Sequence, residues 1–404
     1  MMESEQRPGS VADGGPLGAR LRAAREARRL TQAQVAAELQ VSRPLLIAME
    51  KGSREVQPDE LISLARLYDR PVSELLRPTT PPVAIGARFR AALASVPDAD
   101  NLPGLIVRLE ELADNYLDLL RRAGAEPPGQ YPPVRRIDHL DPAEAAEDLA
   151  VEERNRLGIG DGPIQRLRDV LEVDVGLRIF IEPLPSRVAG LFVYAESLGG
   201  CIALNANHPS ERRRWTLAHE YAHFLVSRDR AEVTLVSHRR QAPEIERFAD
   251  ALAANFLMPR SGLLRRFNEL KRSSAGPVTA AALVQLAHAY RVSVQALTLR
   301  LEDLRLVRPG TWDRLRDNNF QPRAAARILG LEADDEQAAE SLPFHYRILA
   351  TQLYADGEIT ESQLARYLGT DIVGARRVYQ RLTETRDVSD DGASQIVDLA
   401  EAMG

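Results

Sequence analysis

His219-Glu220-Tyr221-Ala222-His223 is an H-E-x-x-H pentad within a segment, 215–226, whose apolar spacing predicts a helix. Residues four apart lie on the same face of a helix, so both imidazoles can address one metal ion. Glu220 follows the first imidazole and can reach a water molecule at that metal. The pentad alone also occurs by chance. A metal site would need a third ligand from elsewhere in the chain.

A second predicted helix, in the segment 244–259, can supply that ligand. Its densely spaced small and apolar residues are typical of a helix buried against a neighbour. A catalytic zinc site takes three protein ligands and leaves one position open, so Glu246 would complete the set. Asp250 lies four residues later on the same face and could accept the free ring N–H of a ligand histidine. Glu244 is the competing third ligand, and a helix salt bridge is the competing role for Asp250.

Length and composition are those of a globular protein with two or three domains. The chain has 404 residues, 44% hydrophobic and 27% charged, and lacks an apolar run long enough to span a membrane. The polar, glycine-rich segment 1–17 has no apolar core, so we expect a disordered tail rather than a secretory signal. The single cysteine, Cys201, excludes an intramolecular disulfide, and we expect a cytoplasmic protein without a membrane partner.

Charge is unevenly distributed along the chain, whose net charge is −6. The segment 18–54 carries eight Lys/Arg and three Glu, a local balance of +5. Such asymmetry indicates a polyanionic partner. Thr31 and Ser42 are predicted helix caps here, and two short helices separated by a tight turn can place the second in a DNA major groove. The helices are predicted at 21–29, 32–39, 43–51, 58–68 and 72–76.

The segment 18–77 resembles a phage-repressor (Cro/XRE-type) helix-turn-helix domain. The resemblance rests on Leu21-Arg-x-x-Arg-Glu-x-x-x-Leu-Thr-Gln-x-x-Val-Ala-x-x-Leu-x-Val-Ser42 and Ile47-x-x-Glu-Lys-Gly52. Apolar residues at 44–48 depart from the polar recognition helix usual in the family. A helical bundle used for protein contact is the competing interpretation. The resemblance gives roles to Gln32 (backbone phosphate), Ser42 and Arg43 (start of the recognition helix, Arg43 contacting a base), Lys51 and Arg54 (DNA), and the ion pair Arg25–Glu50.

A proline-rich break at 77–82 ends this domain. The segment 105–123 predicts one amphipathic helix, either a spacer or a dimerising helix. Three short β-rich runs precede the metal helix and predict a small sheet whose exposed edge could bind an extended peptide. Further helices are predicted at 142–157 and 164–171, and the strands at 175–182, 189–194 and 200–205.

The block 150–305 resembles the ImmA/IrrE family of metallopeptidases. The resemblance implies a thermolysin-like (gluzincin) α+β domain with Zn²⁺ at His219, His223 and Glu246, and Glu220 as general base. Tyr221 replaces the family's usual residue and could either pack or reach substrate. Tyr194 and His238 are candidate oxyanion donors that the sequence cannot place. The residues that carry the resemblance are Gly190, Ile202-Ala-Leu-Asn205, Arg213-x-x-Thr-Leu-Ala-His-Glu-x-Ala-His223 and Glu246-x-x-Ala-Asp-x-Leu-Ala-Ala-x-Phe-Leu-Met-Pro259.

The C-terminal part predicts two more helix pairs, at 278–304 and at 359–382. In the ImmA/IrrE family the first region often resembles a small helix-turn-helix, and 359–369 followed by 375–382 repeats the pattern. A helical packing or dimerisation module and a second DNA contact are both compatible with it.

These observations predict a mostly helical α+β protein. The predicted function is a DNA-binding regulator, expected to act as a homodimer on a double-stranded operator. The resemblance to the ImmA/IrrE family implies that it carries a zinc endopeptidase that cuts a repressor or antitoxin-like protein partner. The alternative is a non-proteolytic antitoxin of a toxin pair with a structural or vestigial metal site, but Glu220 favours activity. The expected parts are a tail (1–17), the helix-turn-helix domain (18–77), a linker and helical spacer (78–149), the peptidase domain (150–305) and a C-terminal helical domain (306–404).

Overall fold

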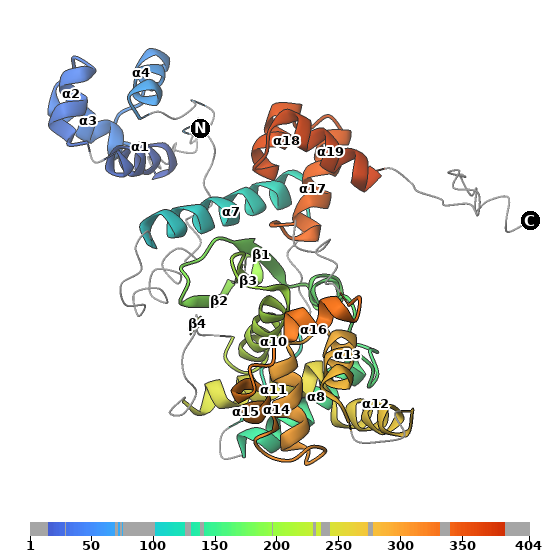
Figure 1. Ribbon diagram of the computed structural model, residues 1–404. Coiled ribbons are helices and arrows are strands. Elements are labelled where there is room, and N and C mark those ends of the chain that lie inside the picture. The colour runs from blue at the N-terminus through green and yellow to red at the C-terminus, as the bar shows by residue number, and fades with distance from the viewer. Residues whose placement is uncertain are drawn as a thin grey trace, which may run out of the picture. The chain divides into compact units, whose positions relative to one another are not determined.

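The computed structural model describes residues 15–28, 30–68, 72, 75, 102–125, 131–137, 141–195, 197–228, 232–235, 243–273, 278–331 and 340–383 (Figure 1). Its contacts divide the chain into two compact units, Met1–Pro82 and Val83–Gly404. Within the described residues, no helix has the length and apolar character needed to cross a membrane.

The first unit is a bundle of short helices around one apolar core that includes Leu21, Val35, Leu46 and Tyr68. Thr31 caps the second helix as predicted, because its hydroxyl accepts the backbone N–H of Gln34 while the Gln34 side chain accepts that of Thr31. The helices are α1 (Gly15–Ala27), α2 (Gln32–Glu38), α3 (Arg43–Glu50) and α4 (Pro58–Tyr68).

Two sequence predictions for this unit need correction. The first helix begins at Gly15, so the end of the expected tail is helical. Ser42 occupies the N-cap position of α3, but its side chain makes no capping hydrogen bond. The proline that follows at the start of the helix has no N–H to be capped, which removes one of the usual donors. The helix expected at 72–76 lies outside the described residues except for Val72 and Leu75.

The second unit is built on a four-stranded sheet with the strand order β1-β3-β2-β4. β1 pairs parallel with β3, while β2 pairs antiparallel with both β3 and β4. Sequence analysis predicted the first three strands and missed β4, a four-residue strand after the metal helix. The strands are β1 (Arg178–Glu182), β2 (Val188–Ala195), β3 (Gly199–Asn205) and β4 (Glu232–Leu235).

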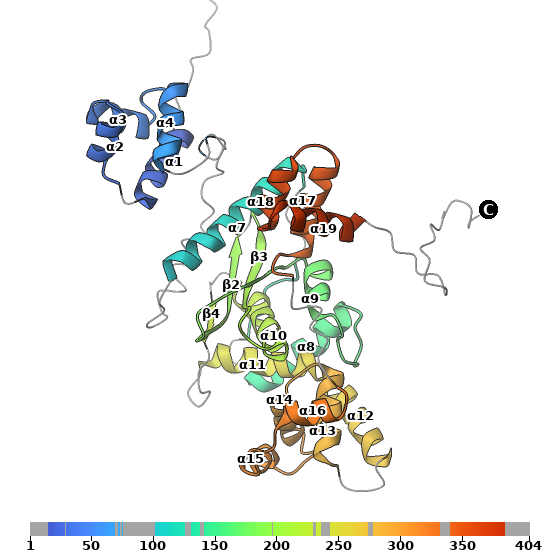
Figure 2. The ribbon, with the colours of Figure 1, turned by 45° about the horizontal axis from the view of Figure 1, so that its top comes forward.

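Both faces of the sheet are covered, and each face has its own apolar core. Alternate residues of β1 divide between them: Ile179 and Ile181 join the core containing α10 (Ser210–Val226), and Phe180 joins the core containing α7 (Leu102–Arg122). Figures 1 and 2 show the sheet between these two helices. The helix with the H-E-x-x-H pentad is therefore held against one face by a complete three-layer structure.

The apolar stripe of α7 is buried against the outer face of the sheet, so this helix is neither a free spacer nor an exposed dimerisation surface. α8 (Pro142–Arg156) packs against α11 (Glu244–Leu257), the helix that carries Glu246. The segment 78–149, expected to be linker and spacer, thus contributes both helices to the second unit. A helix was predicted at 164–171, but the structure has a short turn, α9 (Leu167–Asp169), that widens into a π-helix, η1 (Val170–Asp174).

The C-terminal part does not form a domain of its own, because its helices divide between the two cores. Residues of the segment 304–331 pack on the core around α10, whereas 342–379 pack on the core around α7. The helices that follow α11 are α12 (Arg260–Ser273), α13 (Ala280–Tyr290), α14 (Val294–Asp303), α15 (Thr311–Asp317), α16 (Pro322–Ile328), α17 (Phe344–Ala355), α18 (Glu361–Leu368) and α19 (Ile372–Thr383).

Candidate metal centre

Two buried histidines of α10 face one point. The side chains of His219 and His223 are almost completely buried, and their Nε2 atoms lie 3.2 Å apart. α10 is held between the sheet on one side and α11 on the other, which fixes the direction in which both rings point. The spacing of four residues predicted this shared face.

The carboxylate of Glu246 closes the group from α11. One of its oxygens lies 3.3 Å from Nε2 of His219 and the other lies 3.3 Å from Nε2 of His223. Zinc bound tetrahedrally with ligand distances of 2.0–2.1 Å requires ligand atoms about 3.3 Å from one another. These three side chains therefore fit a tetrahedral ion, and they form the potential metal-binding group found among the described residues. Glu244, the competing ligand, is exposed and is not part of this group.

Asp250 lies behind the first histidine. Its Oδ1 is 3.2 Å from Nδ1 of His219 and 3.5 Å from Nε1 of Trp215. A carboxylate in this place accepts a hydrogen bond from Nδ1–H. The Nε2 lone pair is then directed at the ligand group. Sequence analysis missed Trp215, although it lies four residues before His219 on the same helix face.

The electrostatics of the group favour a positive charge at its centre. Burial alone would lower the pKa of His219, but hydrogen bonds with Asp250 and Glu246 outweigh it and raise the pKa to about 10. Burial would likewise raise the pKa of Glu246, yet its hydrogen bonds with His219 and His223 hold it well below the usual value. A divalent cation held by the three side chains would satisfy this demand.

His223 has a weaker partner than His219. The hydroxyl of Ser227 lies 3.5 Å from Nδ1 of His223 and donates to the backbone carbonyl of the same residue. Ser227 follows His223 by four residues, so this partner could have been found from helical spacing. The two ligand histidines are thus oriented unequally, one by a carboxylate and one by a hydroxyl.

Glu220 is the unusual group of the site. Its side chain is fully buried, and neither carboxylate oxygen has a well-formed hydrogen bond within the described part of the chain, although the Thr234 hydroxyl of β4 lies close enough to favour the ionised form. Burial raises its pKa above the ordinary glutamate value. A buried carboxyl group without a well-formed hydrogen bond costs stability and is usually found where function requires it. It adjoins the ligand group, as expected for a general base.

Gly190 of β2 makes room for this carboxylate. A Cβ atom added at Gly190 would lie 2.7 Å from Oε1 of Glu220 and 2.6 Å from Cγ2 of Thr216. Both contacts are shorter than real Cβ contacts, so only glycine lets β2 approach α10 this closely.

We expect Gly190→Ala to push Glu220 away from the ligand group without removing any ligand. Because small displacements of a reacting group are costly, peptide hydrolysis should fall on the order of 100-fold. Zinc content, measured by elemental analysis, should stay at the wild-type ratio. Ala189→Gly, a change at the neighbouring position of the same strand, is the control; equal activity of both variants would contradict this role of Gly190.

Asp250→Asn keeps the size of the side chain but removes its charge. Loss of such a partner typically weakens metal affinity about 10–100-fold, and we expect that range here. The measurement is competition between the protein and a chromophoric zinc chelator. Asn255→Asp, on the same helix but outside the group, is the charge control, and an unchanged affinity in Asp250→Asn would show that His219 needs no carboxylate.

Two of the remaining candidates of the second unit, Tyr221 and Tyr194, have contacts away from the ligand group. Tyr221 is buried and its hydroxyl accepts a hydrogen bond from Arg156 at 3.1 Å and bonds to Glu153, so it packs rather than reaches outward. The ring of Tyr194 lies beside Tyr131 and under the guanidinium of Arg228. His238 lies outside the described residues.

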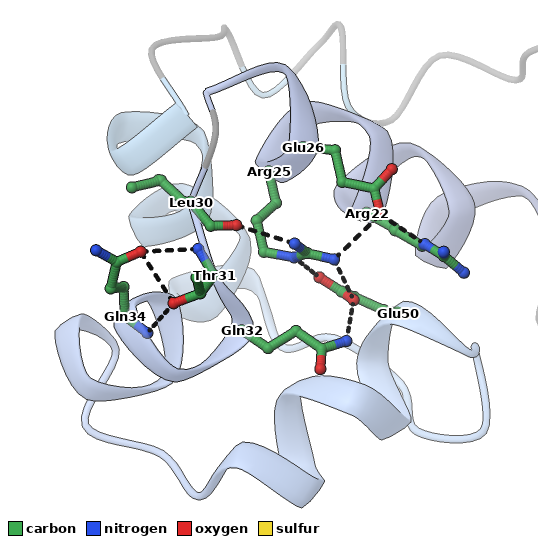
Figure 3. Close-up of polar contacts among 8 residues, drawn as sticks. All are labelled: Arg22, Arg25, Glu26, Leu30, Thr31, Gln32, Gln34 and Glu50. Atoms are coloured by element: carbon green, nitrogen blue, oxygen red, sulfur yellow. Dashed lines mark hydrogen bonds and ion pairs between the residues drawn. The ribbon is translucent and has the colours of Figure 1, made fainter.

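In the first unit, the structure brings Arg25 and Glu50 together (Figure 3). Arg25 Nε donates to Glu50 Oε1 at 2.6 Å and its Nη2 donates to Oε2 at 3.2 Å, with both side chains buried between α1 and α3. Gln32 joins them, because its amide nitrogen donates to Glu50 Oε2 at 2.9 Å. One N–H of that amide is therefore used internally, which leaves the second for a phosphate.

The other predicted DNA contacts differ in their availability. Ser42, Arg43 and Lys51 are exposed at the two ends of α3. Arg54 instead forms an ion pair with Glu60, with 2.8 Å between Nη1 and Oε2. This pair stabilises the start of α4 and uses one nitrogen of the guanidinium, which leaves other N–H donors of Arg54 for a phosphate.

Two protein-family models match the chain, one in each of its two units. The model of the IrrE N-terminal-like domain, a peptidase family, matches residues 173–302, and a helix-turn-helix domain matches residues 16–77. The chain carries a helix-turn-helix domain and an IrrE N-terminal-like domain. The resemblance inferred from sequence motifs is thereby confirmed, and the ligand group with Glu220 lies inside the range 173–302.

Other comparisons add no structural argument. No curated protein sequence matches the chain. Bacillus thuringiensis PlcR in complex with the peptide PapR7 and DNA is 12% identical, covers 91% of this chain and 92% of its own, and has a TM-score of 0.15. ComR from Streptococcus suis is 11% identical with coverage of 91% and 92% and a TM-score of 0.15. Whole chains with such TM-scores do not superpose.

Proposed function

We propose that the protein is a DNA-binding regulator whose IrrE N-terminal-like domain is a thermolysin-like zinc endopeptidase acting on a protein partner. The observation that carries the proposal is Glu220, a fully buried carboxylate that is not used as a ligand and lies next to a ligand group that fits zinc. A purely structural metal site has no use for such a group.

The reaction would use few side chains. A zinc ion held by His219, His223 and Glu246 would supply Lewis-acid activation of a water molecule and of the scissile carbonyl. Glu220 would take a proton as the water oxygen bonds to the carbonyl carbon, and would return it to the amine nitrogen as the C–N bond breaks. Burial raises the pKa of Glu220, which suits a group that must accept and then release a proton near neutral pH.

The substrate would bind as an extended chain along the sheet. β4 pairs with β2 on one side and is the last strand of the described sheet, so a peptide could add to its other side. The opposite edge is less available, because the backbone N–H of Ile181 in β1 bonds to the carbonyl of Ser341 at 2.8 Å. We therefore assign substrate to the β4 edge.

DNA binding would come from the first unit. α2 and α3 would dock as a helix-turn-helix with Ser42 and Arg43 at base edges, and Gln32, Lys51 and Arg54 at phosphates. The Arg25–Glu50 pair fixes α1 to α3 and thereby keeps the recognition helix in place. A palindromic operator would require a homodimer.

The test is cleavage of a proteome-derived peptide library by the zinc-loaded full-length protein, with new termini identified by mass spectrometry. We expect a limited set of cleavage sites that disappears when a chelator removes the metal and returns when zinc is restored. A zinc-loaded protein that generates no new termini would leave the non-proteolytic antitoxin as the better assignment.

A further inference from the structure

α18 and α19 repeat the local structure of α2 and α3. Thr31 and Thr360 both cap their helices in a capping box with the glutamine three residues later. The two residues after that glutamine are Val-Ala in the first case and Leu-Ala in the second, and all four side chains are buried. Sequence and core pattern thus agree between the two helix pairs.

The turns also correspond. Gln40 and Gly369 each lie nine residues after the capping threonine. Both have a left-handed backbone, with φ of 56° and 62°. The next residue donates its N–H to the carbonyl five residues back in each turn, at 2.9 Å and 3.0 Å. α3 begins at Arg43 and α19 at Ile372, each three residues after the left-handed residue. The second helix therefore leaves both turns in the same way.

The exposure of its second helix distinguishes the pair α18 and α19 from the pair α13 and α14. That pair has a similar turn, with Arg291 in the left-handed region, but Val294, Leu297 and Leu301 bury α14 in the core around α10. In α19, Ala375 is the only residue buried to the same extent. Figures 1 and 2 show α19 at the margin of the second unit, outside α17.

The exposed face of α19 has the chemistry of a groove-binding helix. Ile372 and Val373 at its start are 42% and 54% exposed, an unusual position for two β-branched apolar residues. One turn later, Arg377 is exposed and makes no hydrogen bond or ion pair in the described part of the chain. Apolar side chains can contact thymine methyl groups and arginine can contact guanine or phosphate. α19 contains three arginines and no acidic residue.

The acidic groups near α19 are engaged internally. Glu361 of α18 forms an ion pair with Arg376, and Glu340 lies 4.0 Å from Arg381. Asp371 accepts the backbone N–H of Gly374 at 2.6 Å and so acts as a local cap. Arg377 is left as the cation that an external anion can reach.

We propose that α17, α18 and α19 form a second helix-turn-helix that contacts duplex DNA through α19, with Ile372, Val373 and Arg377 in the groove. The inference shares only the partner, duplex DNA, with the proposed function. α17, α18 and α19 belong to the second unit, whereas α3 belongs to the first. It adds a second DNA contact to the same chain.

The experiment measures binding of the full-length protein to a fluorescein-labelled duplex of mixed sequence by anisotropy, over a range of salt concentrations. Arg377→Glu tests α19, Arg43→Glu tests α3, and Arg323→Glu, at an exposed position of α16, is matched for the change in charge. We expect Arg377→Glu to weaken binding on the order of tenfold and to reduce the salt slope by about one, whereas Arg323→Glu stays close to wild type.

The outcomes separate the two proposals. If Arg377→Glu binds like Arg323→Glu, α19 does not contact DNA and the inference is wrong, even when Arg43→Glu abolishes binding and supports the first unit. If Arg377→Glu weakens binding and Arg43→Glu does not, the inference stands and the DNA role of α3 fails. A changed oligomeric state of Arg377→Glu in sedimentation, with unaltered DNA affinity, would identify a protein interface instead and overturn the inference.

Discussion

Glu220→Gln should abolish peptide hydrolysis while leaving the metal centre intact. The amide has nearly the same shape but cannot accept a proton from water, and loss of general-base catalysis costs about 10²–10⁴-fold in rate. None of the ligand atoms changes, so zinc content should equal that of the wild type. The variant also removes an ionisable group from a fully buried position, so its melting temperature should not fall.

The measurement is library cleavage at equal zinc occupancy, with thermal unfolding of both proteins in parallel. His223→Ala serves as the contrasting variant, because it should lose zinc and activity together. Retained cleavage by Glu220→Gln would exclude Glu220 as the base. Loss of zinc in the same variant would show that this carboxylate supports the ligands rather than the chemistry.

Glu50→Ala should unfold the first unit more than any other single truncation of a polar side chain there. The change leaves the Arg25 guanidinium buried between α1 and α3 without its carboxylate, and Gln32 loses its acceptor. Removing one partner of a buried pair costs about 3–5 kcal/mol, a large share of the typical stability of a small domain. DNA binding through α3 should be lost with the fold.

Hydrogen exchange of the α1–α3 amides in the full-length protein measures this effect without separating the units. Glu38→Ala, at an exposed position of α2, is the control and should change little. The double variant Arg25→Met with Glu50→Leu should recover much of the loss, since no unpaired charge remains. Equal exchange in Glu50→Ala and Glu38→Ala would mean that the pair contributes nothing to the bundle.

Sequence analysis could predict the parts of this protein that local spacing determines. The four-residue spacings place the two histidines on one face of α10, and Glu246 and Asp250 on one face of α11, whatever surrounds these helices. The capping box at Thr31 is local in the same sense. These motifs therefore gave the ligand group and the first helix-turn-helix before any tertiary contact was known.

The errors concern tertiary contacts between distant segments. An amphipathic α7 shows that something covers its apolar stripe, but the partner is a sheet that begins more than 50 residues later. β4 has four residues, too few for a periodic signal, and is a strand because β2 pairs with it. The consecutive apolar residues 179–181 of β1 did contain a usable signal, since a strand that is apolar on both sides requires a second covering layer.

Because both faces of the sheet are buried, the second unit cannot be shortened freely. A fragment cut to the matched range 173–302 would lose α7 and α17, and with them the layer over Phe180, Leu191 and Val193. Those side chains would face water as one apolar patch, so the fragment should aggregate on expression. Soluble preparations of the second unit will need the chain from α7 to α19, and a protease that removes the C-terminal helices would inactivate the proposed peptidase without removing a single ligand.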